Sequence, residues 1–173
     1  MKFLKSYTGG LVVLAVVIVL SVLLGSHRSL MGERAKVEAQ FAPIAGDLQD
    51  CLDITANVLS VAGRYLEESR LTALEESRDM LSDWHGVSSG YTAYTRLQEE
   101  AAALLDELEG CSLTDRDAEY VRGFRADLAA EADTIARDGY NAAAEQFNRS
   151  VLGAFPANLL GRLTFVAPAE LFE

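Results

Sequence analysis

Two asparagines in the last third of the chain are the polar side chains whose type and spacing stand out most. Asn141 and Asn148 lie seven residues apart, and each follows an aromatic residue, Tyr140 or Phe147. On a helix this spacing places both amides on one face. An asparagine amide both donates and accepts hydrogen bonds, and beside an apolar core it can set the register between helices. We therefore expect hydrogen bonding inside a bundle; contact with another subunit is the alternative.

The histidines do not form a pattern typical of a metal site or an enzyme. His27 and His85 are the only two, and neither has the glutamate three residues earlier that a di-iron site in a helical bundle requires. No pair of Cys or His residues has zinc-binding spacing, and no glycine-rich turn follows a strand. We expect no catalytic residues, no metal and no cofactor, and we expect His85 to be a solvated loop residue.

The two cysteines, Cys51 and Cys111, could form one disulfide in an oxidising compartment. In the expected helices Cys51 lies roughly 27 Å from the nearer helix end, while Cys111 sits at a helix terminus. A disulfide needs Cα atoms within about 7 Å of each other. We therefore expect two free thiols, with Cys51 as a small core residue.

Acidic pairs recur along the chain, at Glu67-Glu68, Glu75-Glu76 and Glu99-Glu100. Arginines lie near them, so we interpret the pairs as a solvated helical face rather than a cation site. From Ser26 onward, 13 Lys and Arg stand against 26 Asp and Glu, a net charge of −13. Such a surface repels phosphate backbones. Nucleic acid is excluded as an expected partner.

The start of the chain is typical of a membrane anchor. Ser6 to Ser26 contains no charged side chain, and 11–24 reads LVVLAVVIVLSVLL. As a helix, residues 7–25 span roughly 28 Å, close to the hydrocarbon core of a bilayer. We expect residues 1–28 to form a short tail and a segment that crosses the bilayer once. A cleaved signal peptide is the alternative.

Charges flanking the apolar segment bear on its orientation. Lys2 and Lys5 precede it, while Arg28, Arg34 and Lys36 follow it. The short basic N-terminal tail favours a cytoplasmic N-terminus. We expect a single-pass protein of the cell (inner) membrane with an extracytoplasmic body.

The body is expected to be all-α. Pro43, Pro156 and Pro168 are the only prolines, and the stretch between the first two is rich in Ala, Leu, Glu and Arg. Steps of three and four between apolar residues predict a helix from about Leu30 to Glu68, in which Pro43 marks either a kink or the first turn of a new helix near Ala42. Its apolar face comprises Phe41, Ile44, Leu48, Cys51, Leu52, Thr55, Leu59, Ala62 and Leu66.

Three further helical segments are predicted. The first, 71–84, has Leu71, Leu74, Met80, Leu81 and Trp84 on its inner side, and the sequence HGVSSG at 85–90 predicts a loop. The second, 91–108, ends before Gly110. The third begins after Thr114, which can cap it, and continues through Tyr140 to Val151. Residues 29–150 are thus expected to form an antiparallel bundle of three to four long helices. The sequence leaves open whether the segments flanking HGVSSG form one broken helix.

The last 23 residues, 151–173, contain 14 apolar ones and only three charged ones. Pro156 followed by Leu159, Leu160 and Leu163 predicts a short helix before Pro168. A free tail of this composition is costly. It either folds back over the bundle or packs on the membrane or on a second protein.

Residues 140–173 resemble the C-terminal signature of the LemA family. That signature has two aromatic-Asn pairs seven apart, a Phe-Pro, a leucine-rich stretch and a terminal aromatic-Glu. The matching residues are Tyr140-Asn141, Phe147-Asn148, Phe155-Pro156, Leu159-Leu160 and Phe172-Glu173. Phe165, in the same stretch, is grouped with them as a candidate interaction residue. In the first body helix only Asp53 and Asn57 match the family, whose basic pair is absent here.

The resemblance implies a membrane-associated helical protein with a poorly defined molecular role, often a lipoprotein or signal-anchored protein facing outward. We expect a non-enzymatic scaffold or assembly subunit with a protein partner or a homo-oligomeric, coiled-coil-like arrangement. The alternative is a sensory or ligand-binding bundle that acts through a partner, with the helix interruption at HGVSSG opening a pocket.

Overall fold

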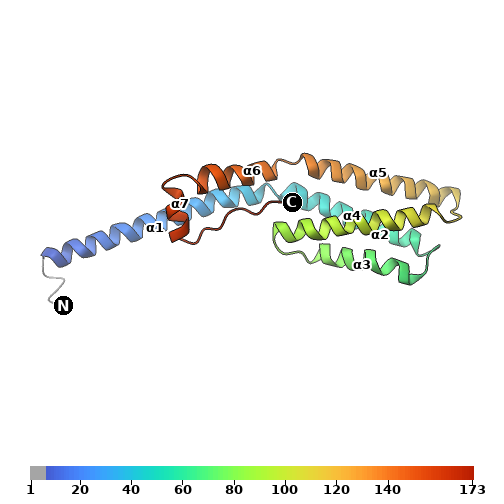
Figure 1. The fold of residues 1–173 in the computed structure, drawn as a ribbon, viewed down its shortest axis with the longest axis horizontal. Helices are drawn as coiled ribbons and strands as arrows, with labels where there is room; N and C mark the ends of the chain where they lie inside the picture. Colours follow the sequence, from blue (N-terminus) through green and yellow to red (C-terminus); the bar gives the residue numbers. More distant parts are fainter. Residues whose placement is uncertain (1–6) are drawn as a thin grey trace. The chain divides into compact units, whose positions relative to one another are not determined.

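The computed structural model describes residues 7–173, and these are all-α, as the sequence predicts (Figure 1). The helices are α1 (Tyr7–Ala39), α2 (Ala42–Ala62), α3 (Glu68–Ser82), α4 (Val87–Glu109), α5 (Asp115–Arg137), α6 (Tyr140–Gln146), the π-helix η2 (Phe147–Leu152) and α7 (Ala157–Leu163). Among the described residues the chain forms two compact units. The first unit comprises residues 7–40 and 142–169, and the second comprises Phe41–Asn141 and Glu170–Glu173.

Helix α1 is the long apolar element of the first unit. From Leu11 to Leu24 most of its large apolar side chains are 41–65% exposed. Among the described residues it is the helix long and apolar enough to cross a membrane, a character that signal sequences share. Its second half, where Leu30 is buried, contacts η2 and α7. The prediction of a short helix after Pro156 is confirmed by α7.

Pro43 belongs to a new helix rather than to a kink. α1 ends at Ala39 and α2 starts at Ala42, so the proline occupies the first turn, where no backbone N–H is needed. The predicted helix from Leu30 to Glu68 is therefore wrong at both ends. Its start belongs to α1, and α2 ends at Ala62, where the backbone N–H of Gly63 bonds back to Leu59.

Helices α2 to α5 form the bundle of the second unit, with α2 against α3 and α5, and α4 against α3 and α5 (Figure 1). The segments flanking HGVSSG are two separate helices, α3 and α4. The loop prediction for 85–90 is wrong for its last four residues, because α4 begins at Val87. Fully buried aliphatic side chains from all four helices form the core, among them Leu48, Val58, Leu74, Leu81, Leu97, Leu108 and Val121.

One detail of the predicted faces differs from the structure, and the prediction for the cysteines agrees with it. Met80 is 41% exposed, because Leu71, Leu74, Ser77 and Leu81 define the inner side of α3 and Met80 lies about 100° away from Leu81. Cys51 is fully buried, as predicted, and both cysteines are free thiols in the structure.

The last long helix begins as predicted but ends early. The side chain of Thr114 caps α5 by accepting a 3.2 Å hydrogen bond from the backbone N–H of Asp117. The predicted continuation to Val151 is wrong, because Asp138 adopts an extended backbone. Its carboxylate accepts a 2.7 Å hydrogen bond from the N–H of Tyr140 and so starts α6.

Candidate functional site

Residues 166–173, the tail segment, fold back onto the protein in an extended conformation. Val166, Ala169 and Phe172 are buried, so every third residue contributes to packing. The apolar composition of this stretch is thereby accounted for by fold-back. The more exposed part of the apolar C-terminal region lies before it, around α7.

Asn148 binds the tail segment in the first unit. Its Nδ2 donates to the carbonyl oxygen of Ala169 at 2.9 Å, and its Oδ1 accepts from the N–H of Ala169 at 2.7 Å. The amide thus satisfies both backbone groups of one residue, as a neighbouring β-strand does. An aspartate or leucine of similar size cannot do both.

Asn141 makes the same pair of bonds in the second unit. Its Nδ2 donates to the carbonyl oxygen of Phe172 at 3.0 Å, and its Oδ1 accepts from the N–H of Phe172 at 2.8 Å. The buried Tyr140 adds a hydrogen bond from its hydroxyl to the carbonyl oxygen of Glu170 at 2.8 Å. The predicted hydrogen bonding of the asparagines is present, although their partner is extended backbone rather than another helix.

The ring of Phe172 completes a group of six aromatic side chains in the second unit. Its centroid lies 5.5 Å from that of Phe41, 5.2 Å from that of Tyr91 and 6.0 Å from that of Tyr94. Phe41 in turn contacts Trp84 and Tyr140 edge-on. This aromatic cluster consists of Phe41, Trp84, Tyr91, Tyr94, Tyr140 and Phe172. Burial raises the pKa of Tyr94 to about 12, in keeping with an apolar environment.

Glu170 lies at the N-terminus of α4. One carboxylate oxygen accepts a 3.2 Å hydrogen bond from the N–H of Ser88, in the first turn of α4. A carboxylate is favourable there because the first N–H groups of a helix are unpaired and carry partial positive charge. Gly86, which precedes α4, has φ 88°, and a Cβ on it would lie 3.1 Å from Glu170 Oε2. The interruption between α3 and α4 at HGVSSG is thus occupied by the tail segment.

The other residues of the signature are placed differently. Phe147 is buried in the first unit, and Pro156 precedes the first residue of α7. Leu160 is half-buried. Phe155, Leu159 and Phe165 are 82%, 53% and 93% exposed. The signature residues therefore fall into three groups: some bind the tail segment, some are buried elsewhere, and some are exposed.

Asp53 and Asn57 are exposed on α2, and no described contact joins them to the tail segment. Asn57 donates to the backbone oxygen of Asp53 at 3.1 Å, and the carboxylate of Asp53 accepts from Gln49 at 3.2 Å. Both are local contacts on one helix.

Asp117 is a buried carboxylate that the sequence does not single out for this role. It accepts hydrogen bonds from the hydroxyls of Tyr65 and Thr114 and from the guanidinium of Arg64 at 2.7 Å. These bonds, that from Tyr65 first, lower the pKa of Asp117 against the opposing effect of burial. The sequence contains its local partner, Thr114 three residues earlier, but Tyr65 and Arg64 come from the turn that follows α2.

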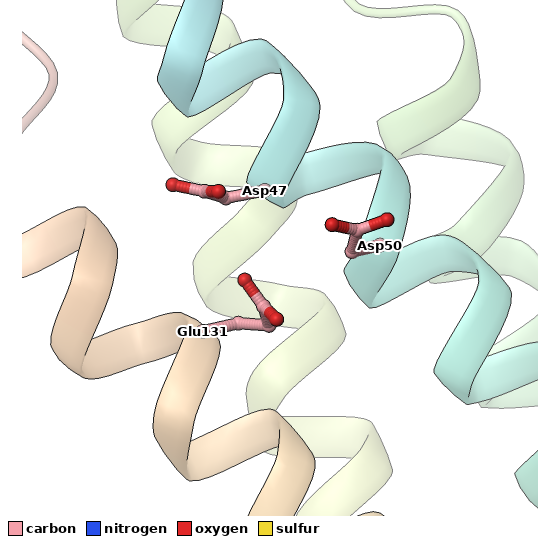
Figure 2. A group of neighbouring side chains, drawn as sticks. All are labelled: Asp47, Asp50 and Glu131. Atoms are coloured by element: carbon pink, nitrogen blue, oxygen red, sulfur yellow. The ribbon is translucent and has the colours of Figure 1, made fainter.

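Three acidic side chains converge between α2 and α5. Figure 2 shows Asp47 and Asp50 of α2 facing Glu131 of α5, and one oxygen from each lies within 4.8 Å of the others. Burial, reinforced by the neighbouring carboxylates, raises the pKa of Asp47 and Glu131. Oxygen atoms of this kind are ligands for hard cations. The described residues hold no further feature that points to a ligand, so we assign no metal to this acidic trio.

The sequence places only two of the three residues of the acidic trio together. Asp47 and Asp50 are three residues apart and so share a helical face. Glu131 joins them only through the packing of α5 on α2, a contact between segments about eighty residues apart that spacing does not predict.

Comparison with known proteins adds no assignment: no family model matches the chain, and no curated protein matches it. The function is therefore argued from the geometry and from the residues themselves.

Proposed function

We propose that this protein is a non-enzymatic, membrane-anchored scaffold or assembly subunit. The observation that carries the proposal is the exposure of α1. Its large apolar side chains from Leu11 to Leu24 point outward all round the helix, whereas most large aliphatic side chains of the bundle are buried. An apolar surface of that extent needs a cover, and its length suits a bilayer.

The placement of the chemically capable side chains supports a structural role. Cys51 is fully buried, and burial beside Glu131 and Asp47 raises its pKa to about 12, so its thiol is unreactive at neutral pH. Asp117 is saturated by hydrogen bonds, and Asn141 and Asn148 are occupied by tail backbone. These four groups therefore have stabilising partners or are shielded from solvent.

A LemA-like identity is part of the proposal. Its support is that two separate elements of the signature meet: Asn141 binds the backbone of Phe172, and the adjacent Tyr140 binds the backbone of Glu170, two residues before Phe172. A LemA-family structure in which the terminal aromatic residue does not bind the first aromatic-Asn pair would remove this support.

The anchor is tested by a charge in α1. Val17→Arg places an ion at the centre of the span, at a cost of about 2.5–3.5 kcal/mol for insertion, and should shift the protein out of the carbonate-resistant membrane fraction. Met31→Arg is the matched control, since Met31 is also exposed on α1 but lies beyond the apolar stretch. Equal membrane fractions for the two variants would contradict a spanning α1.

The scaffold role is tested by cross-linking in intact membranes, followed by native mass measurement in mild detergent. We expect defined complexes that persist when residues 7–25 are replaced by an unrelated apolar span, because the contacts should come from the folded units. Deleting residues 151–173 is a poor test, since Phe172 belongs to the core. Recovery of the protein alone, as a monomer, under all of these conditions would overturn the proposal.

A sensory or ligand-binding bundle is the second candidate. The observation in its favour is a groove of about 220 Å³ beside Tyr91, Tyr94 and Phe172. A ligand there should raise the unfolding temperature in a metabolite screen, and the increase should disappear in Tyr91→Ala. A flat response across the screen, with intact complexes, would favour the scaffold.

A further inference from the structure

Helix α7 and its flanking residues carry an exposed apolar surface in the first unit. Phe155, Leu159, Leu163 and Phe165 are 82%, 53%, 56% and 93% exposed, and we call these four the α7 patch. Leu159 and Leu163 are spaced by four residues, which aligns them along one side of α7, and Phe155 lies in the turn before the helix. These four large apolar side chains form a surface that the rest of this protein does not cover.

The opposite side of α7 rests on α1. Gly161 is buried, and a Cβ on it would lie 2.6 Å from Leu152 Cδ1 and 3.8 Å from Leu30 Cδ1. The missing side chain therefore allows the backbone of α7 to approach η2 and α1, as Figure 1 shows for the second half of α1. The α7 patch consequently faces away from α1.

Contact with Leu30 fixes the depth of α7 along the proposed span. Leu30 lies five residues beyond Gly25, the last residue of the expected span, and five residues of helix rise about 7.5 Å. The polar layer of a bilayer extends roughly 5–8 Å beyond each side of the hydrocarbon core. Helix α7 therefore lies at the level of the lipid headgroups when α1 spans the membrane.

The charge of the first unit suits that location. Its described residues carry five Lys and Arg against three Asp and Glu, a net charge of +2. The second unit carries eight against 23, a net charge of −15. Arg162 lies on α7 itself and is exposed. A weakly cationic surface beside the span favours anionic headgroups, whereas the acidic unit is repelled by them.

The backbone conformation of Phe165 also directs its ring outward. Its φ is 56°, in the left-handed region that bulky residues rarely adopt, and its ring is 93% exposed. This left-handed residue ends α7, where the N–H of Val166 bonds back to the carbonyl oxygen of Gly161 at 2.9 Å, and it presents a large apolar ring outward.

We infer that the α7 patch inserts into the headgroup layer of the bilayer that α1 crosses, so that the protein holds the membrane by a span and a second, interfacial contact. This inference rests on the spanning role proposed for α1. The occupant is the lipid surface itself, because α7 packs on α1 just beyond the span, lies at headgroup depth and carries positive charge at Arg162.

The test uses tryptophan emission from the full-length protein in vesicles of phosphatidylcholine and phosphatidylglycerol. Trp84→Phe removes the native signal, and Phe165→Trp, Leu159→Trp and Val17→Trp then report one position each. Lipids brominated near the headgroup end or near the methyl end of the acyl chain act as quenchers. We expect Phe165→Trp and Leu159→Trp to emit at shorter wavelength than in water and to lose intensity mainly to the shallow bromines, and Val17→Trp to lose it mainly to the deep ones.

The outcomes separate this inference from the proposed function. Quenching of Val17→Trp with unquenched, long-wavelength emission from both patch variants would overturn the interfacial contact and leave the span standing. An unquenched Val17→Trp would overturn the span. Short-wavelength but unquenched patch emission would indicate cover by protein, and its dependence on protein density would indicate a second copy; both would overturn lipid as the occupant. Tyr120→Trp, an exposed aromatic position on the acidic unit, is the control, and equal quenching there would reduce the patch signal to nonspecific adsorption.

Discussion

The side-chain amide of Asn141 is paired with the main chain of Phe172 through two hydrogen bonds, of 3.0 and 2.8 Å. The residues are 31 positions apart, and the bonds place the Phe172 ring among the aromatic side chains of the second unit. Asn141 therefore holds Phe172 in position, and its removal should affect the packing of the second unit.

Asn141→Ala should lower the free energy of unfolding of the second unit by about 1–3 kcal/mol, because it leaves two partly buried backbone groups of Phe172 without partners. Urea unfolding in nonionic detergent, followed by Trp84 fluorescence, measures the change. Asn57→Ala is the control, since Asn57 is exposed and bonds only within α2, and it should stay within about 0.5 kcal/mol of the native protein. Equal effects of the two substitutions would contradict the role of Asn141.

Phe172→Ala and Phe165→Ala remove the same side chain from opposite environments. Phe172 is 5% exposed and Phe165 is 93% exposed. The first substitution should destabilise the second unit by about 3–5 kcal/mol through lost burial and a residual cavity. The second should change the unfolding midpoint in detergent little. A small effect of Phe172→Ala would mean that the aromatic cluster closes without the tail segment.

The acidic trio makes stability depend on pH. A carboxyl whose pKa is raised by folding binds its proton more tightly in the folded state, so stability increases as the pH falls through that raised pKa. The ordinary values are about 3.9 for Asp and 4.3 for Glu, so the unfolding temperature should rise as the pH falls from neutral toward these values. Glu131→Gln should reduce this rise and stabilise the protein at neutral pH by about 0.5 kcal/mol, the scale of an exposed charge pair.

The control for Glu131→Gln is Glu119→Gln, on the same helix and exposed. It removes the same charge away from Asp47 and Asp50 and should leave the pH dependence unchanged. A stabilisation by both substitutions would assign the effect to net charge rather than to the trio.

Asp117 should produce the opposite slope in more acidic solution. Its pKa is lowered by folding, so its contribution is present above the ordinary aspartate value of about 3.9 and is lost as the pH falls through the lower, folded value. The unfolding temperature should therefore decline below about pH 4. Tyr65→Phe removes the foremost of the bonds that lower this pKa, so the decline should become smaller and should end at a higher pH. An unchanged acid limb would contradict the assignment.

Local signals in the sequence predict much of the helix pattern. Thr114 and Pro43 mark helix starts because their chemistry acts within one turn, through a cap and through a missing N–H. The break at Asp138 has an equally local cause, since Asp-Gly is a common turn pair. It was obscured by the apolar spacing that continues across it from Ile135 to Tyr140 and Phe147.

The candidate site is less accessible from sequence. The spacing of Asn141 and Asn148 indicates a shared face, but their partners are backbone groups of Phe172 and Ala169, which carry no sequence code of their own. Glu170 likewise reads as one of three charges in an apolar stretch until its contact with Ser88 is seen. Interactions between distant segments depend on which helices pack together, and periodicity specifies only the faces.

The buried thiol of Cys51 can report how often the second unit opens. Its thiol is fully enclosed between helices and has a pKa of about 12, so an alkylating reagent meets neither access nor thiolate while the second unit is closed. Cys111, partly exposed after α4, reacts without any opening. The rate at which Cys51 is modified therefore measures how often the bundle of the second unit opens, without any need to unfold the protein.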